Sequence, residues 1–335
     1  MIDIVSKRHL NFIIYTVLIV VSLLMFAFAK LNFGIDITGG TQTEYSYENA
    51  IDIEEIKTNT AKIAEEINAQ TAIINGTSVY NVTGENTFVV EAWFNRWLPE
   101  PEIEAYKTEF RERVDSYLAN YDQTISFSKY VNIGASFGDY IKDTAKITLV
   151  IAIVWISLYV AYAFAGSVWW VSSSSFAVVT IITLFHDVVI ASGLYIFVSL
   201  FLPEFKIDTF FVTALLTILW YSINDTIVVS DRIRANLKLY WGKKKDLKEI
   251  VNMSVNETIS RSIYTSVTLL FVLVAILFFW PESISGFTLV MIFGTIVWTY
   301  SSVFVASPLI YEINKNKKLE IYKKKEKSQE DLIVV

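Results

Sequence analysis

Long stretches without a single charged side chain constrain this sequence more than any other feature. They run over 12–29, 147–185, 188–203, 209–224, 262–281 and 283–311. A helix needs about 20 mostly apolar residues to cross the hydrocarbon core of a bilayer, so the second stretch must hold one span and most of another. The pattern predicts six transmembrane helices, at 11–30, 145–165, 171–200, 209–231, 258–280 and 286–310.

These spans divide the chain into regions whose sidedness follows from the basic residues. The predicted parts are a cytoplasmic N-terminus with the first helix (1–30), an exterior domain (31–142), a five-helix membrane domain (143–311) that includes a basic cytoplasmic loop (232–256), and a basic cytoplasmic tail (312–335). Sixteen of the 28 Lys and Arg residues lie before the first span, between the fourth and fifth, or after the sixth. Because basic residues stay on the cytoplasmic side, both termini are expected inside the cell.

Three further inferences come from the N-terminus and from the composition. A cleaved signal peptide is an alternative for the N-terminus, but the apolar core of 18 residues over 12–29 exceeds the usual length of about 7–15. The exterior segment is acidic, which argues against a nucleic-acid partner. The chain has no cysteine, so disulfides and thiol chemistry are excluded.

Between the first two spans the pattern changes to that of a water-soluble α+β domain. Alternation predicts one strand at 41–48, two within 77–94 and one at 123–131, while helical spacing predicts helices at 52–69 and from about 99 to 118. The expected order is βαββαβ, the ferredoxin-like arrangement. In the preceding segment FGIDITGGT, Gly39 and Gly40 are expected to form a tight turn after a short strand, since glycine tolerates positive φ.

Asp225 is the most unusual residue of the predicted spans, because a charge inside a membrane helix costs about 2.5–3.5 kcal/mol. It lies six residues, or about 9 Å, before Asp231 at the cytoplasmic end of its helix, too far for an aspartate to reach water comfortably. Arg261 lies at comparable depth on the next helix. We therefore expect Asp225 to be paired with Arg261, protonated, or in contact with water in a polar cavity.

Other polar residues accompany this pair. His186 and Asp187 lie near the middle of the third span, and Ser222, Asn224, Thr226 and Ser262 lie close in sequence to Asp225 or Arg261. A buried carboxylate whose distance from a guanidinium changes can bind and release protons, and so convert a gradient into motion. The alternative is a static ion pair that only fixes helix packing, and His186 with Asp187 allows a similar structural interpretation.

The sequence resembles a known family, SecF, the smaller half of the SecDF component of bacterial protein export. The resemblance covers nearly the whole chain in order. It is carried by FGIDITGGT after the first span, SFGDYIKDTAKI before the second, HDVVI in the third, YSINDTIVVSDRIRANL ending the fourth, and GTIVWTYSSVFVASPL in the sixth.

The resemblance implies a relative of the RND superfamily that works with SecD beside the SecYEG channel, and extends to SecA and YidC as partners. The proton-motive force would drive movements that help to pull an unfolded preprotein across the bacterial cytoplasmic membrane. By this resemblance Asp225 and Arg261 correspond to the family's proton-pathway residues. Protons would be the coupling ion, with no cofactor, metal or covalent catalysis.

The tryptophans depart from the family pattern. SecF proteins usually have glycine where this chain has Trp220, and tend to glycine at Trp280 and Trp298. The 12 glycines in 335 residues are about half the usual ~7%, although membrane helices favour glycine. An indole at 220 is expected to wedge helices apart near Asp225. Our hypothesis is that the source organism reads UGA as glycine; UGG codons at the three positions would exclude it.

Three other functions are compatible with parts of this pattern. An RND-type exporter of lipid or small molecules shares the same logic, although a single six-span half requires a partner in either case. An intramembrane aspartyl protease would use Asp187 and Asp225, but the chain has Ser222-Ile-Asn-Asp in place of Gly-x-Gly-Asp, and Arg261 would disturb a shared proton. A scaffold with inert ion pairs is the third.

Overall fold

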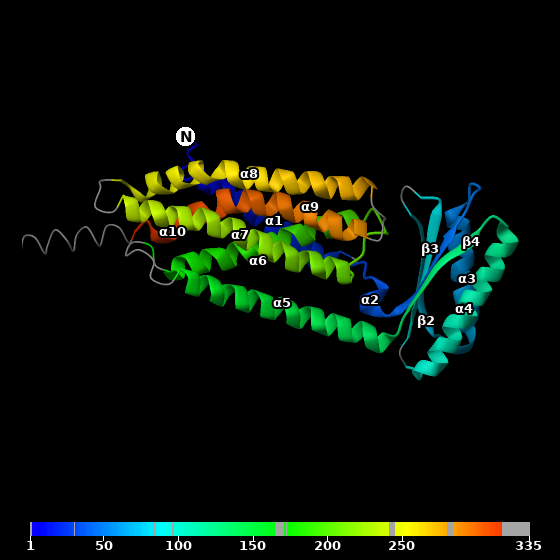
Figure 1. The fold of residues 1–335 in the computed structure, drawn as a ribbon. Coiled ribbons are helices and arrows are strands. Elements are labelled where there is room, and N and C mark those ends of the chain that lie inside the picture. Colours follow the sequence, from blue (N-terminus) through cyan, green and yellow to red (C-terminus); the bar gives the residue numbers. More distant parts are fainter. Residues whose placement is uncertain are drawn as a thin grey trace, which may run out of the picture.

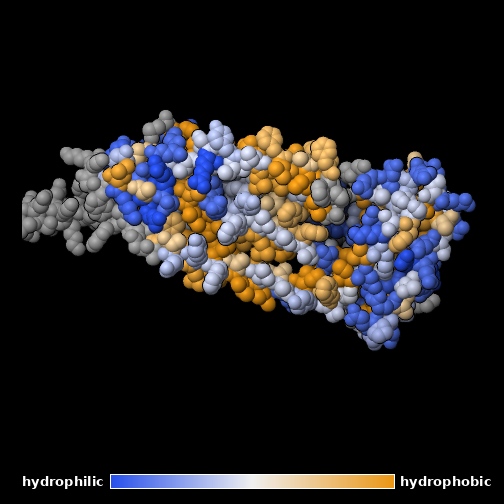
Figure 2. Space-filling model, in the orientation of Figure 1, coloured by the Kyte–Doolittle hydropathy of each residue, from blue (hydrophilic) through white to orange (hydrophobic). Residues whose placement is uncertain are grey.

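The chain folds into a long helical bundle with an α+β domain at one end (Figure 1). The computed structural model describes residues 2–29, 31–82, 85–95, 97–164, 171, 173–240, 245–279 and 284–316. Within these residues, six helices are long and apolar enough to cross a membrane. A hydrophobic surface covers the middle of the bundle, and hydrophilic surface covers both ends (Figure 2). The protein is therefore a multi-pass membrane protein.

The bundle helices run side by side along its length (Figure 1). They are α1 (Arg8–Phe28), α5 (Ala135–Ala163), α6 (Ser173–Ser199), α7 (Thr209–Leu239), α8 (Leu247–Phe279), α9 (Ser285–Ser301) and α10 (Ser307–Asn314), with a π-helical turn, η2 (Ser302–Ala306), joining the last two. The sixth predicted span is thus one unbroken helical segment that contains a wider, π-helical turn.

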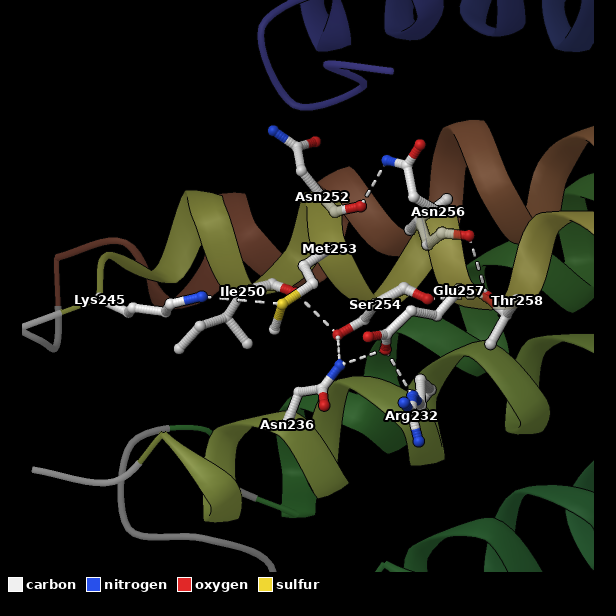
Figure 3. Close-up of polar contacts among 11 residues, drawn as sticks. Arg232, Asn236, Lys245, Ile250, Asn252, Met253, Ser254, Asn256, Glu257 and Thr258 are labelled. Atoms are coloured by element: carbon white, nitrogen blue, oxygen red, sulfur yellow. Dashed lines mark hydrogen bonds and ion pairs between the residues drawn. The ribbon is translucent and has the colours of Figure 1, made fainter. Parts of the chain in front are cut away.

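The stretch 232–256, predicted as a basic loop, is mostly helix. Helix α7 continues to Leu239 and α8 begins at Leu247, so only a short connection separates them. Polar contacts join the two extensions (Figure 3): Arg232 Nε contacts Glu257 Oε2 at 2.6 Å, and Asn236 Nδ2 donates to Glu257 Oε2 at 2.8 Å. Hydropathy located the apolar segments but not these charged ends, which form helix because they pair with each other.

The N-terminal segment is anchored on the same end of the bundle. The backbone N–H groups of Ile4 and Val5 both donate to Asn252 Oδ1 of α8, at 3.0 and 3.1 Å. Both apolar side chains are buried among residues of α7 and α8. The start of the chain therefore lies at the end of the bundle away from the α+β domain.

The α+β domain follows the predicted order of strands and helices. Its elements are β1 (Gly40–Ser46), α3 (Ile53–Thr71), β2 (Ile74–Asn81), β3 (Thr87–Phe94), α4 (Glu100–Tyr121) and β4 (Ser126–Ile133). The antiparallel sheet has the order β2-β3-β1-β4. Helices α3 and α4 cover the sheet face away from the bundle (Figure 1), and Ile56, Phe88 and Leu118 are buried between these layers.

The segment before the sheet forms a one-turn helix, α2 (Ile35–Thr38), rather than the expected short strand. Hydrogen bonds from the N–H groups of Ile37 and Thr38 to Gly34 O close this turn. Gly39 and Gly40 then take positive φ angles of 73° and 142°. A Cβ atom on Gly40 would lie 2.5 Å from Ala92 O, so the close approach of β1 and β3 also requires a glycine here.

The loop between α6 and α7 attaches the bundle to the open face of the sheet. Gly34 N donates to Ile207 O at 2.9 Å, and Ile207 N donates to Asn32 O at 2.7 Å. Next to this contact, the ammonium group of Lys206 pairs with Glu91 of β3, and both side chains are buried. Burial lowers the pKa of Lys206, and the Glu91 carboxylate opposes that shift.

Asp208 begins α7 beside this ion pair. Its Oδ1 accepts the N–H of Phe211 at 2.7 Å, the standard cap of a helix start. Burial, together with the nearby charge of Asp36, raises the pKa of Asp208 to about 6. A cavity of about 510 Å³ lies beside these residues, between the sheet and the bundle. The attachment of the two parts is therefore polar, although it is largely removed from water.

Removing one member of the buried pair should cost more than removing both. We expect Glu91→Gln or Lys206→Met alone to lower the free energy of unfolding by about 3–5 kcal/mol, because each leaves the other group buried without its partner. The double variant should be closer to the unchanged protein. Unfolding by SDS titration of the purified chain measures this; additive losses in the double variant would contradict it. Lys57→Met, which breaks an exposed pair with Glu54, is the control and should change stability by less than about 1 kcal/mol.

Candidate functional site

The carboxylate of Asp225 points into the bundle and is held by two hydroxyl groups from other elements. Ser262 Oγ of α8 donates to Asp225 Oδ1 at 2.7 Å, and Ser302 Oγ of η2 donates to Asp225 Oδ2 at 2.5 Å. The Asp225 side chain is partly buried. The structure therefore surrounds this carboxylate with hydroxyl donors, an environment that was not among the three predicted, and such donors stabilise a carboxylate in an apolar medium.

Arg261 does not form the expected direct pair with Asp225. Its side chain is exposed on the outer face of α8, and it makes no ion pair within the part of the chain that the structure describes. Consecutive residues of a helix point about 100° apart, so when Ser262 faces Asp225 its neighbour Arg261 cannot. The guanidinium is still near enough to Asp225 for an electrostatic attraction. The role of both residues in proton transfer stays a prediction.

His186 and Asp187 form a second polar centre that is fully enclosed. Asp187 Oδ1 contacts His186 Nδ1 at 2.8 Å, and Asp187 Oδ2 accepts hydroxyl protons from Ser222 of α7 at 2.6 Å and Ser301 of α9 at 2.8 Å. Neither His186 nor Asp187 is appreciably exposed. Ser222 therefore serves Asp187 rather than the Asp225 that lies one turn further along its own helix.

Two predicted residues remain, of which Asn224 lies outside the bundle and Thr226 inside it. Asn224 is exposed on α7 and makes no hydrogen bond to either carboxylate within the described residues. Thr226 is buried, and its hydroxyl has no hydrogen-bond partner within the described residues. Ser301 and Ser302 were not predicted as site residues, although two adjacent serines in a span without charged residues were a visible signal.

The tryptophans do not disturb the carboxylates in the expected way. Trp220 is 67% exposed and points out of the bundle, so the prediction that it wedges the helices apart is wrong. Position 220 falls outside the buried stripe of α7, which includes Leu219, Ser222 and Thr226. Trp298 is buried, and its ring stacks on Tyr221 with centroids 5.3 Å apart. Trp280 lies outside the described residues, and the codon hypothesis stays open.

In the part of the chain that the structure describes, fold and site together define a class: a membrane protein with six spans, an α+β domain inserted after the first, and two carboxylates inside the bundle. Comparison with known families places it further. Residues 113–316 match the family described as protein export membrane protein SecD/SecF, C-terminal, and residues 25–51 match the SecD/SecF GG motif. The first of these matches covers more than half of the chain. The chain belongs to the SecD/SecF family.

Individual relatives agree with this assignment. The chain is 33% identical to the protein translocase subunit SecF of Calditerrivibrio nitroreducens over 95% of both chains. It is 32% identical to the SecF subunit of Endomicrobium trichonymphae, over 96% of this chain and 94% of that one. The crystal structure of SecDF, a translocon-associated membrane protein from Thermus thermophilus, matches 94% of this chain with a TM-score of 0.74 and 26% identity. The chain spans 39% of that SecDF chain. It is a SecF-like protein translocase subunit.

The hydroxyl groups around Asp225 should contribute to stability only through that carboxylate. We expect Ser262→Ala and Ser302→Ala each to lower the free energy of unfolding by about 1–3 kcal/mol, because each removes a donor from a buried acceptor. In an Asp225→Asn background each serine variant should lose less stability, because the amide has only one oxygen that can accept a hydroxyl proton. SDS titration of the three single and two double variants gives the two coupling energies.

Ser260→Ala is the matched control, because Ser260 lies on the same helix as Ser262 but is exposed. Its effect should stay within about 0.5 kcal/mol. Equal losses from Ser262→Ala with and without Asp225→Asn would show that the hydroxyl stabilises the bundle by some other contact.

Proposed function

We propose that this SecF-like subunit uses the proton-motive force, together with SecD, to assist the export of unfolded preproteins through SecYEG. The observation that carries the proposal is the placement of Asp225. It is a carboxylate inside a membrane bundle, bonded to hydroxyls of two other elements, and Arg261 is the neighbour of one of these hydroxyl residues, Ser262, on α8. Such intramembrane carboxylates mark ion and proton pathways.

The hydroxyl partners of Asp225 suit a group that changes its protonation. A serine hydroxyl can donate to a carboxylate and can accept from a carboxylic acid, so Ser262 and Ser302 can serve both states. Arg261 stabilises only the ionised one. A rotation or shift of α8 would exchange the contact of Ser262 for that of Arg261. Proton binding at Asp225 would then favour one position of α8 over another, which is how a gradient produces movement.

The charge distribution supports an orientation in the bacterial cytoplasmic membrane. The helix ends opposite the α+β domain carry the basic residues of α7 and α8, and the N-terminal segment is anchored there. By the positive-inside tendency we infer that this end faces the cytoplasm, and we propose the same side for both termini. The α+β domain, which we assign to the ferredoxin-like class from its strand order, then lies on the exterior, where an emerging preprotein would meet it.

The exposed position of Arg261 supports a partner within the membrane. An exposed guanidinium facing lipid would cost about 2.5–3.5 kcal/mol or more. Spans of SecD packed against the outer face of α8 would remove Arg261 from lipid. SecA and YidC are proposed as further partners through the translocase. The mechanism requires no covalent catalysis and no cofactor, because the proton is the coupling ion.

Asp225→Asn and Arg261→Met should each abolish the gradient-driven part of preprotein export while leaving ATP-driven export intact. Asparagine keeps the shape of Asp225 but cannot ionise, and methionine keeps the apolar stem of Arg261 without its charge. The measurement is preprotein import into inverted membrane vesicles with and without a proton gradient.

Asp231→Asn is the matched control, since Asp231 lies on the same helix but is exposed and pairs with Arg234 at the end of the bundle. Co-purification with SecD should be unchanged in all three variants. Full gradient-dependent stimulation by Asp225→Asn would overturn the proposed function.

A further inference from the structure

The carboxylate of Asp187 is more completely enclosed than that of Asp225. It is 0% exposed, and its hydrogen-bond partners come from its own helix, from α7 and from α9. A packing role alone would be met at much lower cost by a neutral side chain, because burying a carboxylate is expensive even when it is well bonded. The presence of a charge-bearing group in this position therefore calls for a further explanation.

His186 supplies a second observation that points to an exchangeable ligand. The residue is 2% exposed, its Nδ1 contacts Asp187, and its Nε2 is buried without a hydrogen-bond partner in the described part of the chain. The ring packs on Tyr15 of α1, with centroids 4.5 Å apart. An unsatisfied buried nitrogen costs about 1–3 kcal/mol. A water molecule or an added proton at Nε2 would satisfy it.

The π-helical turn connects this centre to Asp225. Ser301, the last residue of α9, donates to Asp187, and Ser302, the first residue of η2, donates to Asp225. Adjacent helix residues diverge by about 100°, so two consecutive hydroxyls reach carboxylates on two different helices. Turns of this wider kind are frequent at functional sites. A change of charge at Asp187 therefore alters the hydrogen bond of Ser301, and a change at Asp225 alters that of its neighbour Ser302.

We propose that His186 and Asp187 form a second proton-binding station, coupled to Asp225 through Ser301 and Ser302. This inference rests on the proposed function of Asp225. A proton delivered by water to Nε2 gives an imidazolium beside an ionised Asp187. Transfer of the Nδ1 proton to Asp187 Oδ1 then breaks one N–H bond and forms one O–H bond, which leaves a neutral ring and a carboxylic acid. One proton has entered, and nothing is oxidised or reduced.

The charges around the station explain why it is coupled to Asp225. Asp187 and Asp225 lie close enough to repel each other when both are ionised, so neutralising one makes the charge of the other easier to hold. Tyr15 of α1 faces His186, and Tyr300 of α9 lies beside Tyr15 at 5.4 Å between ring centroids. Arg261, whose charge attracts that of Asp225, is exposed on α8.

The small number of histidines allows a direct test in the full-length chain. The sequence has two, His186 and the exposed His9, so ¹⁵N-histidine labelling gives two imidazoles and His9→Gln assigns them. In lipid nanodiscs between pH 5 and 9, we expect the His186 ring to change its protonation state. Asp225→Asn should displace the midpoint of that change by about one pH unit, because the two stations interact.

Export measurements then separate the station from simple packing. His186→Gln and Asp187→Asn should flatten the pH dependence of gradient-driven export. Asp187→Glu, which keeps a carboxyl group, should retain part of that dependence. Thr180→Ala is the matched control on α6, since Thr180 is also buried but its hydroxyl bonds Phe176 O of its own helix. Co-purification with SecD should be unchanged in every variant.

The outcomes for this station differ from those for Asp225 itself. A His186 ring that keeps one protonation state from pH 5 to 9, or a midpoint unmoved by Asp225→Asn, would overturn the inference while leaving the proposed function in place. Normal gradient-driven export by Asp225→Asn would overturn the proposed function, whereas the coupling seen by ¹⁵N would remain.

Discussion

Hydrogen bonds from serine hydroxyls to carboxylates inside the membrane bundle are the interaction on which the arrangement of its inner helices depends. Asp187 and Asp225 each accept two such bonds, from Ser222 and Ser301 in the first case and from Ser262 and Ser302 in the second. Every donor comes from a different element than its acceptor. Because an unpaired carboxylate is so unfavourable in an apolar interior, these bonds favour one packing of α6, α7, α8 and η2 over its alternatives.

A membrane site can act on a preprotein only if its movement reaches the α+β domain. A connection between the two parts exists, since α7 carries Asp225 and its N-cap residue, Asp208, lies in the loop that holds the sheet. The buried pair of Lys206 with Glu91 joins that loop to β3. In the proposed function a displacement of α7 would therefore be transmitted to the sheet through a short and largely buried contact, not through a flexible linker.

The predictions from sequence were strongest where a single local pattern decides the structure. Six apolar helices and the alternation of strands and helices in the inserted domain follow from hydropathy and periodicity, and both are observed. They were weakest where charged segments form helix by pairing, as in 232–256, and where side-chain direction matters. Trp220 and Arg261 were both expected to act inside the bundle, yet both point outwards, because one residue along a helix changes the direction by about 100°.

The sequence by itself determined that this chain spans the membrane, where the inserted domain lies and which ionisable groups, Asp187 and Asp225 among them, are forced into apolar surroundings. These properties depend on composition and spacing along one segment at a time. The tertiary structure alone decided which hydroxyl serves which carboxylate, that Ser262 rather than Arg261 meets Asp225, and that Lys206 pairs with Glu91. Such contacts join residues far apart in the chain, and they depend on the rotation of each helix about its axis, which only packing against its neighbours can set.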